Sequence, residues 1–374
     1  MSKKLVHTPE GVRDIYGDEK AKKMEVERLL REKVHAYGYR DIQTPTFEFF
    51  DVFSKEVGTT PSKELYKFFD KEGNTLVLRP DFTPSIARCA AKYFMDENVP
   101  IRFCYQGNTF TNTSELQGKL KEVTQMGAEL VGDDSVQADA EMIAMTIEAL
   151  YHAGLSDFQV SIGNVEYFKG ICAQAGLDEE TEMELRELIS GKNYFGAEEL
   201  LAHKNVNAKD REILLRTSDL FGSVDALEDA KKSVHNERSL QAIERLEKVY
   251  QVLCDYGVEK YVSFDLTMLS KYNYYTGIIF KGYTYGVGDA IVKGGRYDTL
   301  LSRFGKEAPA IGFMVVVDDL LVAMSRQNVM IAQPKKHVQI YYREDNFKEQ
   351  LKQAKILRAE GKNVELLPEE KGRL

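Results

Sequence analysis

The order of helix-like and strand-like segments is the feature that most limits the fold of this chain. The two kinds alternate at first, then nearly every segment between about residues 165 and 258 has helical period and high charge, and strand-like runs return afterwards. Two of these runs, Ile101–Phe110 and Glu122–Gly132, flank a polar tip at 112–121, which is typical of antiparallel strands. The order predicts an α+β fold: an antiparallel sheet flanked by helices, with a helical insertion.

A short segment at 333–336, Gln-Pro-Lys-Lys, is typical of a linker and divides the chain into two predicted parts. Residues 1–330 hold the sheet and the insertion of about 165–258. Residues 335–374 carry the pattern of a single β-α-β unit, which is too small to fold alone. We therefore expect this unit to dock on something or to be the remnant of a larger domain.

Composition excludes several classes of protein. The 374 residues are 43% hydrophobic, which is enough for a sizeable core and excludes a mostly disordered chain. The net charge of −9 works against binding to polyphosphates such as nucleic acid. No apolar run approaches the roughly 18 residues of a membrane-spanning helix, and the N-terminus has no hydrophobic run of the kind that directs export. We expect a cytoplasmic protein.

Short motifs of enzyme chemistry are missing from the chain. There is no GxxxxGK[ST], GxGxxG, HExxH or GxSxG sequence. The six histidines are isolated and the four cysteines are scattered without a CxxC pair, so the sequence predicts reduced thiols, no metal site and no cofactor.

Two acidic residues stand where a carboxylate needs a partner. Asp81 follows a strand-like run, and Glu129 lies inside one. Period 2 places Gln125, Gly127 and Glu129 on one face of that strand, with the glycine leaving room between the polar pair. One interpretation is a structural ion pair with an arginine such as Arg79. The other is a pocket for a cationic or NH-bearing ligand.

Two further pairs have both a structural and a functional interpretation. Tyr274-Tyr275 is typical of core or cross-strand packing. Gly294-Gly295 follows a strand-like run and is typical of a tight turn, or alternatively of a ligand cradle. Neither pair decides a function by itself.

The same residues carry a family resemblance. From Thr8 to about Ala323 the chain resembles the catalytic domain of histidyl-tRNA synthetase, which has a class II synthetase fold and a helical insertion. The segments that match its opening segment, motif 1, motif 2, its two histidine signatures and motif 3 are, in order, Thr8–Asp14, Tyr39–Pro45 after a long helix, Ile101–Glu129, Asn273–Gly277, Gly294–Asp298 and Ala310–Asp319.

The chain departs from the synthetase at three arginine positions. The arginine and glutamate of motif 2 are missing where the chain has Phe110-Thr111-Asn112-Thr113, the arginine of the first histidine signature is Ser270, and the final arginine of motif 3 is Asp319. Adenylation develops charge on phosphate oxygens, so each lost cation removes stabilisation of the transition state. Asp319 would place a negative charge where a triphosphate lies. The departures imply no catalysis and poor binding of ATP.

The amino-acid half of the synthetase pocket is kept. The resemblance implies that an acid and a threonine hold the α-amino group, and that a glutamine and a glutamate read the α-carboxyl side and the imidazole. It also implies that Tyr275 lies at the far ring nitrogen, with Tyr274 beside it. These implied histidine-binding residues are Asp81, Thr83, Gln125, Glu129, Tyr274 and Tyr275.

A synthetase-like chain with this pocket and these losses resembles the regulatory subunits of ATP phosphoribosyltransferase. The resemblance implies a non-catalytic subunit that joins a short-form catalytic subunit. Together they perform the first step of histidine biosynthesis, with L-histidine as feedback effector. It also implies a homodimer through motif 1 and neither tRNA nor membrane as a partner. Two alternatives stay open: a divergent histidyl-tRNA synthetase, and a binding module that senses uncharged tRNA or serves only as a dimeric scaffold.

Overall fold

The structure is a computed structural model of the chain. It describes residues 6–54, 60–97, 99–113, 119–216, 220–268, 274–332 and 337–369. The chain divides into two compact units, one of Met1–Asp14 with Val26–Met330 and the other of Ile15–Glu25 with Ile331–Leu374.

The α-helices of the described residues are α1 (Gly17–Ala36), α2 (Thr83–Tyr93), α3 (Val136–His152), α4 (Val165–Gln174), α5 (Glu179–Ser190), α6 (Tyr194–His203), α7 (Ala208–Arg216), α8 (Asp225–Ser233), α9 (Glu237–Asp255), α10 (Val317–Arg326) and α11 (Phe347–Ala359). The strands are β1 (Arg40–Asp41), β2 (Phe47–Phe49), β3 (Lys67–Phe69), β4 (Thr75–Leu78), β5 (Ile101–Phe110), β6 (Glu122–Val131), β7 (Phe158–Asn164), β8 (Phe221–Gly222), β9 (Val262–Asp265), β10 (Ile278–Thr284), β11 (Val292–Arg296), β12 (Ala310–Val316), β13 (Val338–Tyr342) and β14 (Val364–Pro368).

A nine-stranded sheet organises the larger unit, in the order β1-β5-β6-β12-β11-β10-β7-β9-β8. Neighbouring strands run antiparallel except at β1–β5 and β7–β9, where they are parallel. A separate three-stranded sheet has the order β2-β4-β3. The predicted α+β fold with a mainly antiparallel sheet is confirmed.

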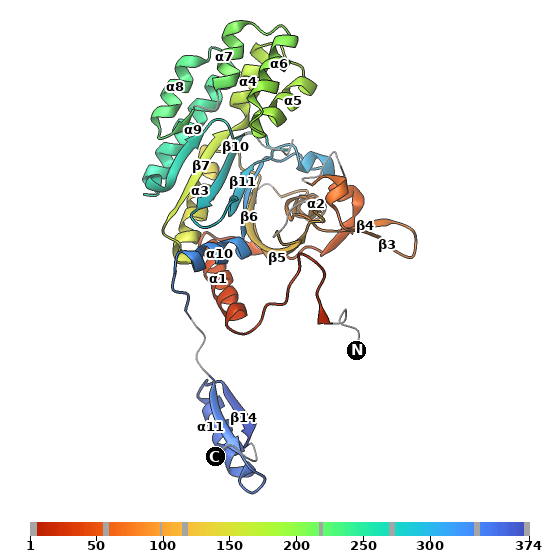
Figure 1. Cartoon of the computed structure of the whole chain (residues 1–374), viewed down its shortest axis with the longest axis vertical. Helices are drawn as coiled ribbons and strands as arrows, with labels where there is room; N and C mark the ends of the chain where they lie inside the picture. The colour runs from red at the N-terminus through yellow and green to blue at the C-terminus, as the bar shows by residue number, and fades with distance from the viewer. Residues whose placement is uncertain are drawn as a thin grey trace. The chain divides into compact units, whose positions relative to one another are not determined.

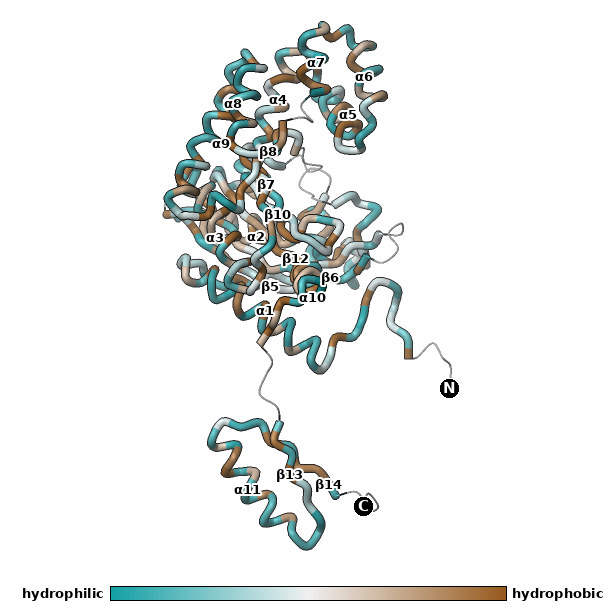
Figure 2. The backbone as a smooth tube through the Cα atoms, turned by 60° about the vertical axis from the view of Figure 1, so that its left-hand side comes forward, coloured by the Kyte–Doolittle hydropathy of each residue, from teal (hydrophilic) through white to brown (hydrophobic). Residues whose placement is uncertain are grey.

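The predicted helical insertion is present as α4 to α9. Figure 1 shows α5 to α8 gathered at one end of the unit, beyond β7 and β10. Figure 2 shows why the sequence folds this way: hydrophobic stretches gather on the strands of the sheet, whereas the insertion helices alternate between hydrophobic and hydrophilic residues. Such alternation at helical period buries one face of each helix, as with Ile243, Leu246 and Leu253 of α9, which are fully buried.

Several element boundaries follow the sequence closely and others do not. Strand β5 has the predicted bounds. The tyrosine pair, which is typical of cross-strand packing, lies in the turn before β10, and that strand starts at Ile278. Ser135 caps α3 by accepting a hydrogen bond from the Ala138 N–H at 3.1 Å.

The smaller unit contains the predicted β-α-β segment. Its strands β13 and β14 pair in parallel, with α11 connecting them. Only Ile340 and Ala354 are buried among its described hydrophobic residues, which is a very small core. The linker expected at 333–336 lies outside the described residues. None of the helices within the described ranges is long and apolar enough to cross a membrane.

Candidate functional site

A pocket opens over the middle strands of the sheet, and all six predicted histidine-binding residues lie on its walls. It contains about 530 Å³ of space including its open mouth. Strands β6, β11 and β12 form its floor, and the start of α2 and the turn before β10 form its sides. Its lining residues are Thr60, Pro80, Asp81, Thr83, Tyr105, Gln125, Glu129, Tyr274, Tyr275, Lys293, Gly294, Gly295, Tyr297, Gly312, Phe313 and Met314.

The start of α2 positions Asp81 and Thr83. The Asp81 carboxylate accepts hydrogen bonds from the backbone N–H groups of Phe82 at 2.6 Å and Thr83 at 3.3 Å. Pro84 occupies the first turn of the helix, where its missing N–H has no consequence. One oxygen of the Asp81 carboxylate therefore accepts hydrogen bonds at the start of the helix, while the side chain also lines the pocket.

Glu129 is the most deeply buried acid of the pocket, with an exposed fraction of 1%. The Thr83 hydroxyl donates to its Oε1 at 2.8 Å, and the Tyr297 hydroxyl donates to its Oε2. Both donors are neutral, so the carboxyl group is solvated by hydroxyls without an ion pair in these contacts.

Burial raises the pKa of the Glu129 carboxyl to about 8. The hydrogen bonds from Tyr297 and Thr83 favour the ionised form but do not offset the loss of water, and the charge of Asp81 raises the pKa further. A ligand that brings a positive charge or an N–H donor would compensate this carboxyl directly.

Glycines on the floor strands make room for the polar side chains. A Cβ on Gly312 would lie 1.6 Å from Glu129 Oε2, and a Cβ on Gly295 would lie 2.6 Å from the Tyr275 ring. The space over Gly127, which we expected to separate Gln125 from Glu129, is occupied by the Tyr105 hydroxyl. The Gly294-Gly295 pair lies within β11 and forms no tight turn, so that interpretation is wrong.

Gln125 and the tyrosine pair complete the predicted set. Gln125 is 7% exposed, and its Oε1 is buried with no hydrogen-bond donor among the described residues. Tyr274 and Tyr275 lie with ring centroids 4.4 Å apart, and Tyr274 also contacts Tyr297 edge-on. Tyr275 packs into the core with Ile279, which confirms the packing interpretation, and it also lines the pocket.

The alternative of an ion pair between Glu129 and Arg79 is wrong. Arg79 donates to the backbone carbonyls of Asn108 at 2.8 Å and Thr44 at 3.0 Å, and its guanidinium stacks over the Phe82 ring at 4.0 Å. Arg79 is thus a structural residue that ties β4 to the neighbouring segments.

The three positions where the synthetase arginines are replaced lie in different surroundings. Thr111 continues from β5, where its N–H bonds to the Lys121 carbonyl at 2.9 Å, and Ser270 lies outside the described residues. Asp319 does not line the pocket. Burial raises the pKa of its carboxyl, as do the charges of Asp289 and Asp318, whereas Lys293 and Lys119 lower it.

Sequence reasoning missed three residues that shape the pocket: Tyr105, Lys293 and Tyr297. Burial, and then the nearby charge of Glu129, raises the pKa of the Tyr105 and Tyr297 hydroxyls well above the ordinary range. Both hydroxyls therefore stay protonated and neutral. Tyr105 could have been found by pairing β5 with β6, because it lies opposite Gly127. Lys293 could have been found as the residue before the glycine pair.

Away from this pocket, the structure brings His35, Asp41 and Cys104 within 4.8 Å of one another, although we expected isolated histidines. His35 Nε2 lies 3.0 Å from the Asp41 carboxylate, and Arg31 lies 3.4 Å from the same group. Burial, then Asp41, raises the pKa of the Cys104 thiol to about 12. The arginine and the protonated thiol both oppose a cation at this place.

Comparisons with known proteins agree with this geometry. The family model of histidyl-tRNA synthetase matches residues 11–320. A solved histidyl-tRNA synthetase from Nostoc sp. PCC 7120 has the same fold, with a TM-score of 0.81 at 22% identity over 99% of this chain and 87% of that one. Fold and pocket together define a histidyl-tRNA synthetase-like protein of class II.

Closer relatives narrow this class. The crystal structure of an ATP phosphoribosyltransferase regulatory subunit/histidyl-tRNA synthetase from Bacillus halodurans C matches with a TM-score of 0.88 and 35% identity, over 97% of this chain and 93% of that one. ATP phosphoribosyltransferase regulatory subunits from Ruminiclostridium cellulolyticum and Acetivibrio thermocellus are 44% and 42% identical, over 100% and 98% of this chain and 89% and 88% of theirs. The chain belongs to the family of ATP phosphoribosyltransferase regulatory subunits.

Proposed function

We propose that this chain is the non-catalytic regulatory subunit of ATP phosphoribosyltransferase and that it binds L-histidine as feedback effector in the pocket around Glu129. The observation that carries the proposal is the pocket itself: two carboxyl groups, Asp81 and Glu129, face a partly enclosed cavity with aromatic walls. The names of the relatives support the role in the first step of histidine biosynthesis.

The chemistry of the pocket matches each part of histidine. Asp81 and Thr83 suit the α-ammonium group, as a carboxylate and a hydroxyl that both accept hydrogen bonds. Glu129 suits an imidazole N–H, since its buried carboxyl lacks a cation in its hydrogen bonds. Lys293, which lines the same pocket, is the cation available to the α-carboxylate in place of the lost arginine.

Regulation then follows from linkage. Histidine that binds one conformation of the assembly more tightly than another shifts the population toward it, typically by 1–3 kcal/mol of coupling, roughly 5- to 150-fold in affinity. The phosphoribosyl transfer belongs to the partner, a short-form catalytic subunit.

We also propose that the chain forms a homodimer through motif 1. Strand β1 is the edge of the nine-stranded sheet and both of its residues are exposed. The adjoining β2 exposes Phe47 and Phe49 at 53% and 56%. Exposed aromatic rings and an open strand edge are both typical of a surface that another chain covers.

Calorimetric titration with L-histidine tests the effector site, first on the purified chain and then on its complex with the catalytic subunit. We expect saturable heat that Glu129→Gln weakens while the fold is kept. No heat from either sample at millimolar histidine would refute the effector role. Histidine-dependent exchange of pyrophosphate into ATP tests the alternative of a divergent synthetase, and we expect none above the blank.

A further inference from the structure

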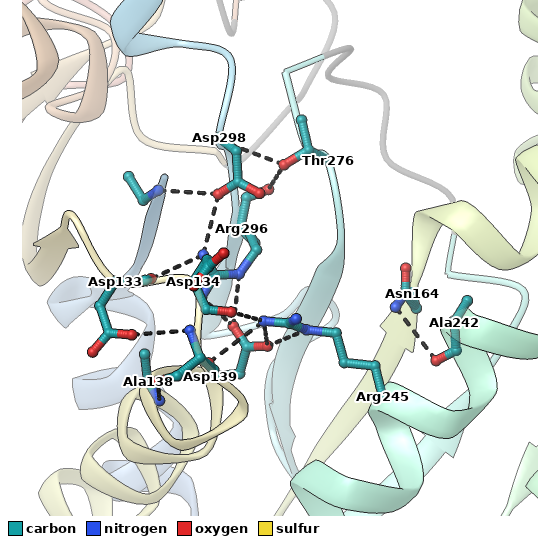
Figure 3. Close-up of polar contacts among 12 residues, drawn as sticks. Asp133, Asp134, Ala138, Asp139, Asn164, Ala242, Arg245, Thr276, Arg296 and Asp298 are labelled. Atoms are coloured by element: carbon teal, nitrogen blue, oxygen red, sulfur yellow. Dashed lines mark hydrogen bonds and ion pairs between the residues drawn. The ribbon is translucent and has the colours of Figure 1, made fainter. Parts of the chain in front are cut away.

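A buried charge network joins the helical insertion to the sheet behind the pocket. Its centre is Asp139 of α3, whose side chain is fully buried. Arg296 of β11 donates to Asp139 Oδ1 through Nε at 2.8 Å and through Nη2 at 2.6 Å. Arg245 of α9 donates to Asp139 Oδ2 through Nε at 2.7 Å. Figure 3 shows the two guanidinium groups converging on this carboxylate from different elements.

The sheet side of the network fixes two short segments of backbone. Arg296 also donates from Nη1 to Asp298 Oδ1 at 3.1 Å, while the Asp298 N–H donates to Thr276 Oγ1 at 2.9 Å. The Thr276 N–H in turn donates to the Arg296 carbonyl at 2.8 Å. The network thereby ties residues 275–277 to residues 296–298.

Each of these segments carries a wall of the pocket. Tyr275 precedes Thr276, and Tyr297 lies between Arg296 and Asp298. Both tyrosines line the pocket, and the Tyr297 hydroxyl donates to Glu129. Neighbouring residues in an extended chain point to opposite sides, so the network lies behind the wall that the ligand would touch.

Arg245 is the residue that the insertion contributes to this network, and it is the more exposed of the two arginines. Its side chain is 29% exposed, whereas Arg296 is 3% exposed. It lines a second cavity, which contains about 860 Å³ of space including its open mouth, together with other residues of α9 such as Arg238 and Lys248. It also donates to the Asp134 carbonyl at 2.7 Å, before the start of α3.

Withdrawal of Arg245 would unbalance the charges around Asp139. Among the described residues only Arg245 donates to Asp139 Oδ2. Without Arg245, the guanidinium group of Arg296 would have to serve the carboxylates of both Asp139 and Asp298. A buried carboxylate with an unsatisfied oxygen is costly, so Arg296 is drawn toward Asp139 and its hold on Asp298 weakens.

We propose that Arg245 is a positioning residue for the effector pocket: through this one guanidinium the helical insertion completes the charge network that holds the segments bearing Tyr275 and Tyr297. The inference rests on the proposed histidine site and gives the insertion a role in it. Movement of α9 would change the pocket without any contact between the insertion and the ligand.

Histidine affinity of matched variants tests this. Arg245→Met keeps the length of the side chain and removes its charge, Arg245→Lys keeps the charge, and Arg238→Met is the control. Arg238 faces the same second cavity from α9 but pairs with Glu166 and makes no contact with Asp139. By calorimetry we expect Arg245→Met to weaken histidine binding about tenfold, Arg245→Lys to restore part of it, and Arg238→Met to stay within about twofold of wild type.

Amide hydrogen exchange without histidine provides an independent measurement. We expect Arg245→Met to speed exchange in residues 274–277 and 296–298, and Arg238→Met to leave both segments unchanged. The exchange measurement separates the proposed histidine site from the proposed role of Arg245, because it needs no ligand. A wild-type chain that does not bind histidine would refute the histidine site and would still allow the exchange test. Should Arg245→Met be unfolded, Arg245→Lys carries both measurements.

The outcomes that overturn the inference are definite. A folded Arg245→Met chain with wild-type affinity for histidine would show that the network is only structural. Equal losses in Arg245→Met and Arg238→Met would show a general effect of disturbing the insertion. Unchanged exchange in both segments, in a folded Arg245→Met chain, would remove the physical link.

Discussion

The buried carboxyl of Glu129 makes the stability of the empty protein depend on pH, and Glu129→Gln should remove that dependence. The amide of glutamine has nearly the shape of a protonated carboxyl group and carries no charge at any pH. It therefore imitates the neutral form, which burial favours at this position. The substitution tests the burial argument without any ligand.

The magnitude follows from linkage. The Glu129 pKa is about 8 in the folded chain against an ordinary value of 4.5. Between these values the folded chain holds a proton that the unfolded chain has released, so the free energy of unfolding falls as pH rises from 4.5 to 8. The slope is about 1.4 kcal/mol per pH unit, which reaches about 5 kcal/mol over the whole interval. Glu129→Gln lacks this loss, so its advantage over wild type grows with pH and levels off above pH 8.

Urea unfolding at several pH values between 5 and 9 measures this difference. Far-ultraviolet circular dichroism suits the chain, which has no Trp. Glu184→Gln is the matched control, because the same chemical change is made at an exposed position of α5. If the difference between Glu129→Gln and wild type stays constant across the series, the carboxyl ionises normally and the reasoning from burial is wrong.

Two further predictions concern the same pocket. Histidine affinity should be greatest between about pH 6.5, the ordinary pKa of imidazole, and pH 8, the approximate pKa of Glu129. In this range the free imidazole is neutral and the free Glu129 is protonated, so together they hold one proton, as the complex does. A flat profile in titrations across pH would show that no proton is shared. Gly312→Ala should abolish binding, since its Cβ would lie 1.6 Å from Glu129 Oε2, whereas Gly288→Ala, whose Cβ meets nothing within 4 Å, should bind like wild type. Equal binding by both variants would contradict the packing of the floor.

Much of the pocket could be predicted because it lies on regular elements. The period of β6 places Gln125 and Glu129 on one face, and both line the cavity. The strand, proline and helix pattern around Asp81 fixes the start of α2, which brings Thr83 to Glu129. Such local patterns depend on residues close in sequence, and the resemblance to a family supplied the chemistry that they serve.

The remaining features depend on strand register and on contacts between distant segments. Tyr105 reaches the pocket because β5 pairs with β6 opposite Gly127, and a single strand pattern does not reveal its partner. Asp139 and Arg296 are 157 residues apart in sequence, so no local pattern connects them. The prediction of a tight turn at the glycine pair was wrong for the same reason. Glycine is needed at 294 and 295 because the Phe280 and Tyr275 rings pack against β11 and leave no room for a Cβ.

The lysines change the electrostatic argument about nucleotide binding. The sequence predicts that Asp319 places a negative charge where the synthetase has an arginine. In the structure Lys293 and Lys119 lie near enough to lower its carboxyl pKa, while Asp289 and Asp318 raise it. Three carboxylates against two ammonium groups still leave this region short of positive charge, but Lys293 also lines the amino-acid pocket. A single cation at the border can serve a carboxylate of charge −1, whereas a triphosphate needs several, because its charge is larger and is spread over many oxygens. With this balance of charges Lys293 can pair with one carboxylate of a ligand in the pocket, whereas these residues offer a triphosphate too little positive charge.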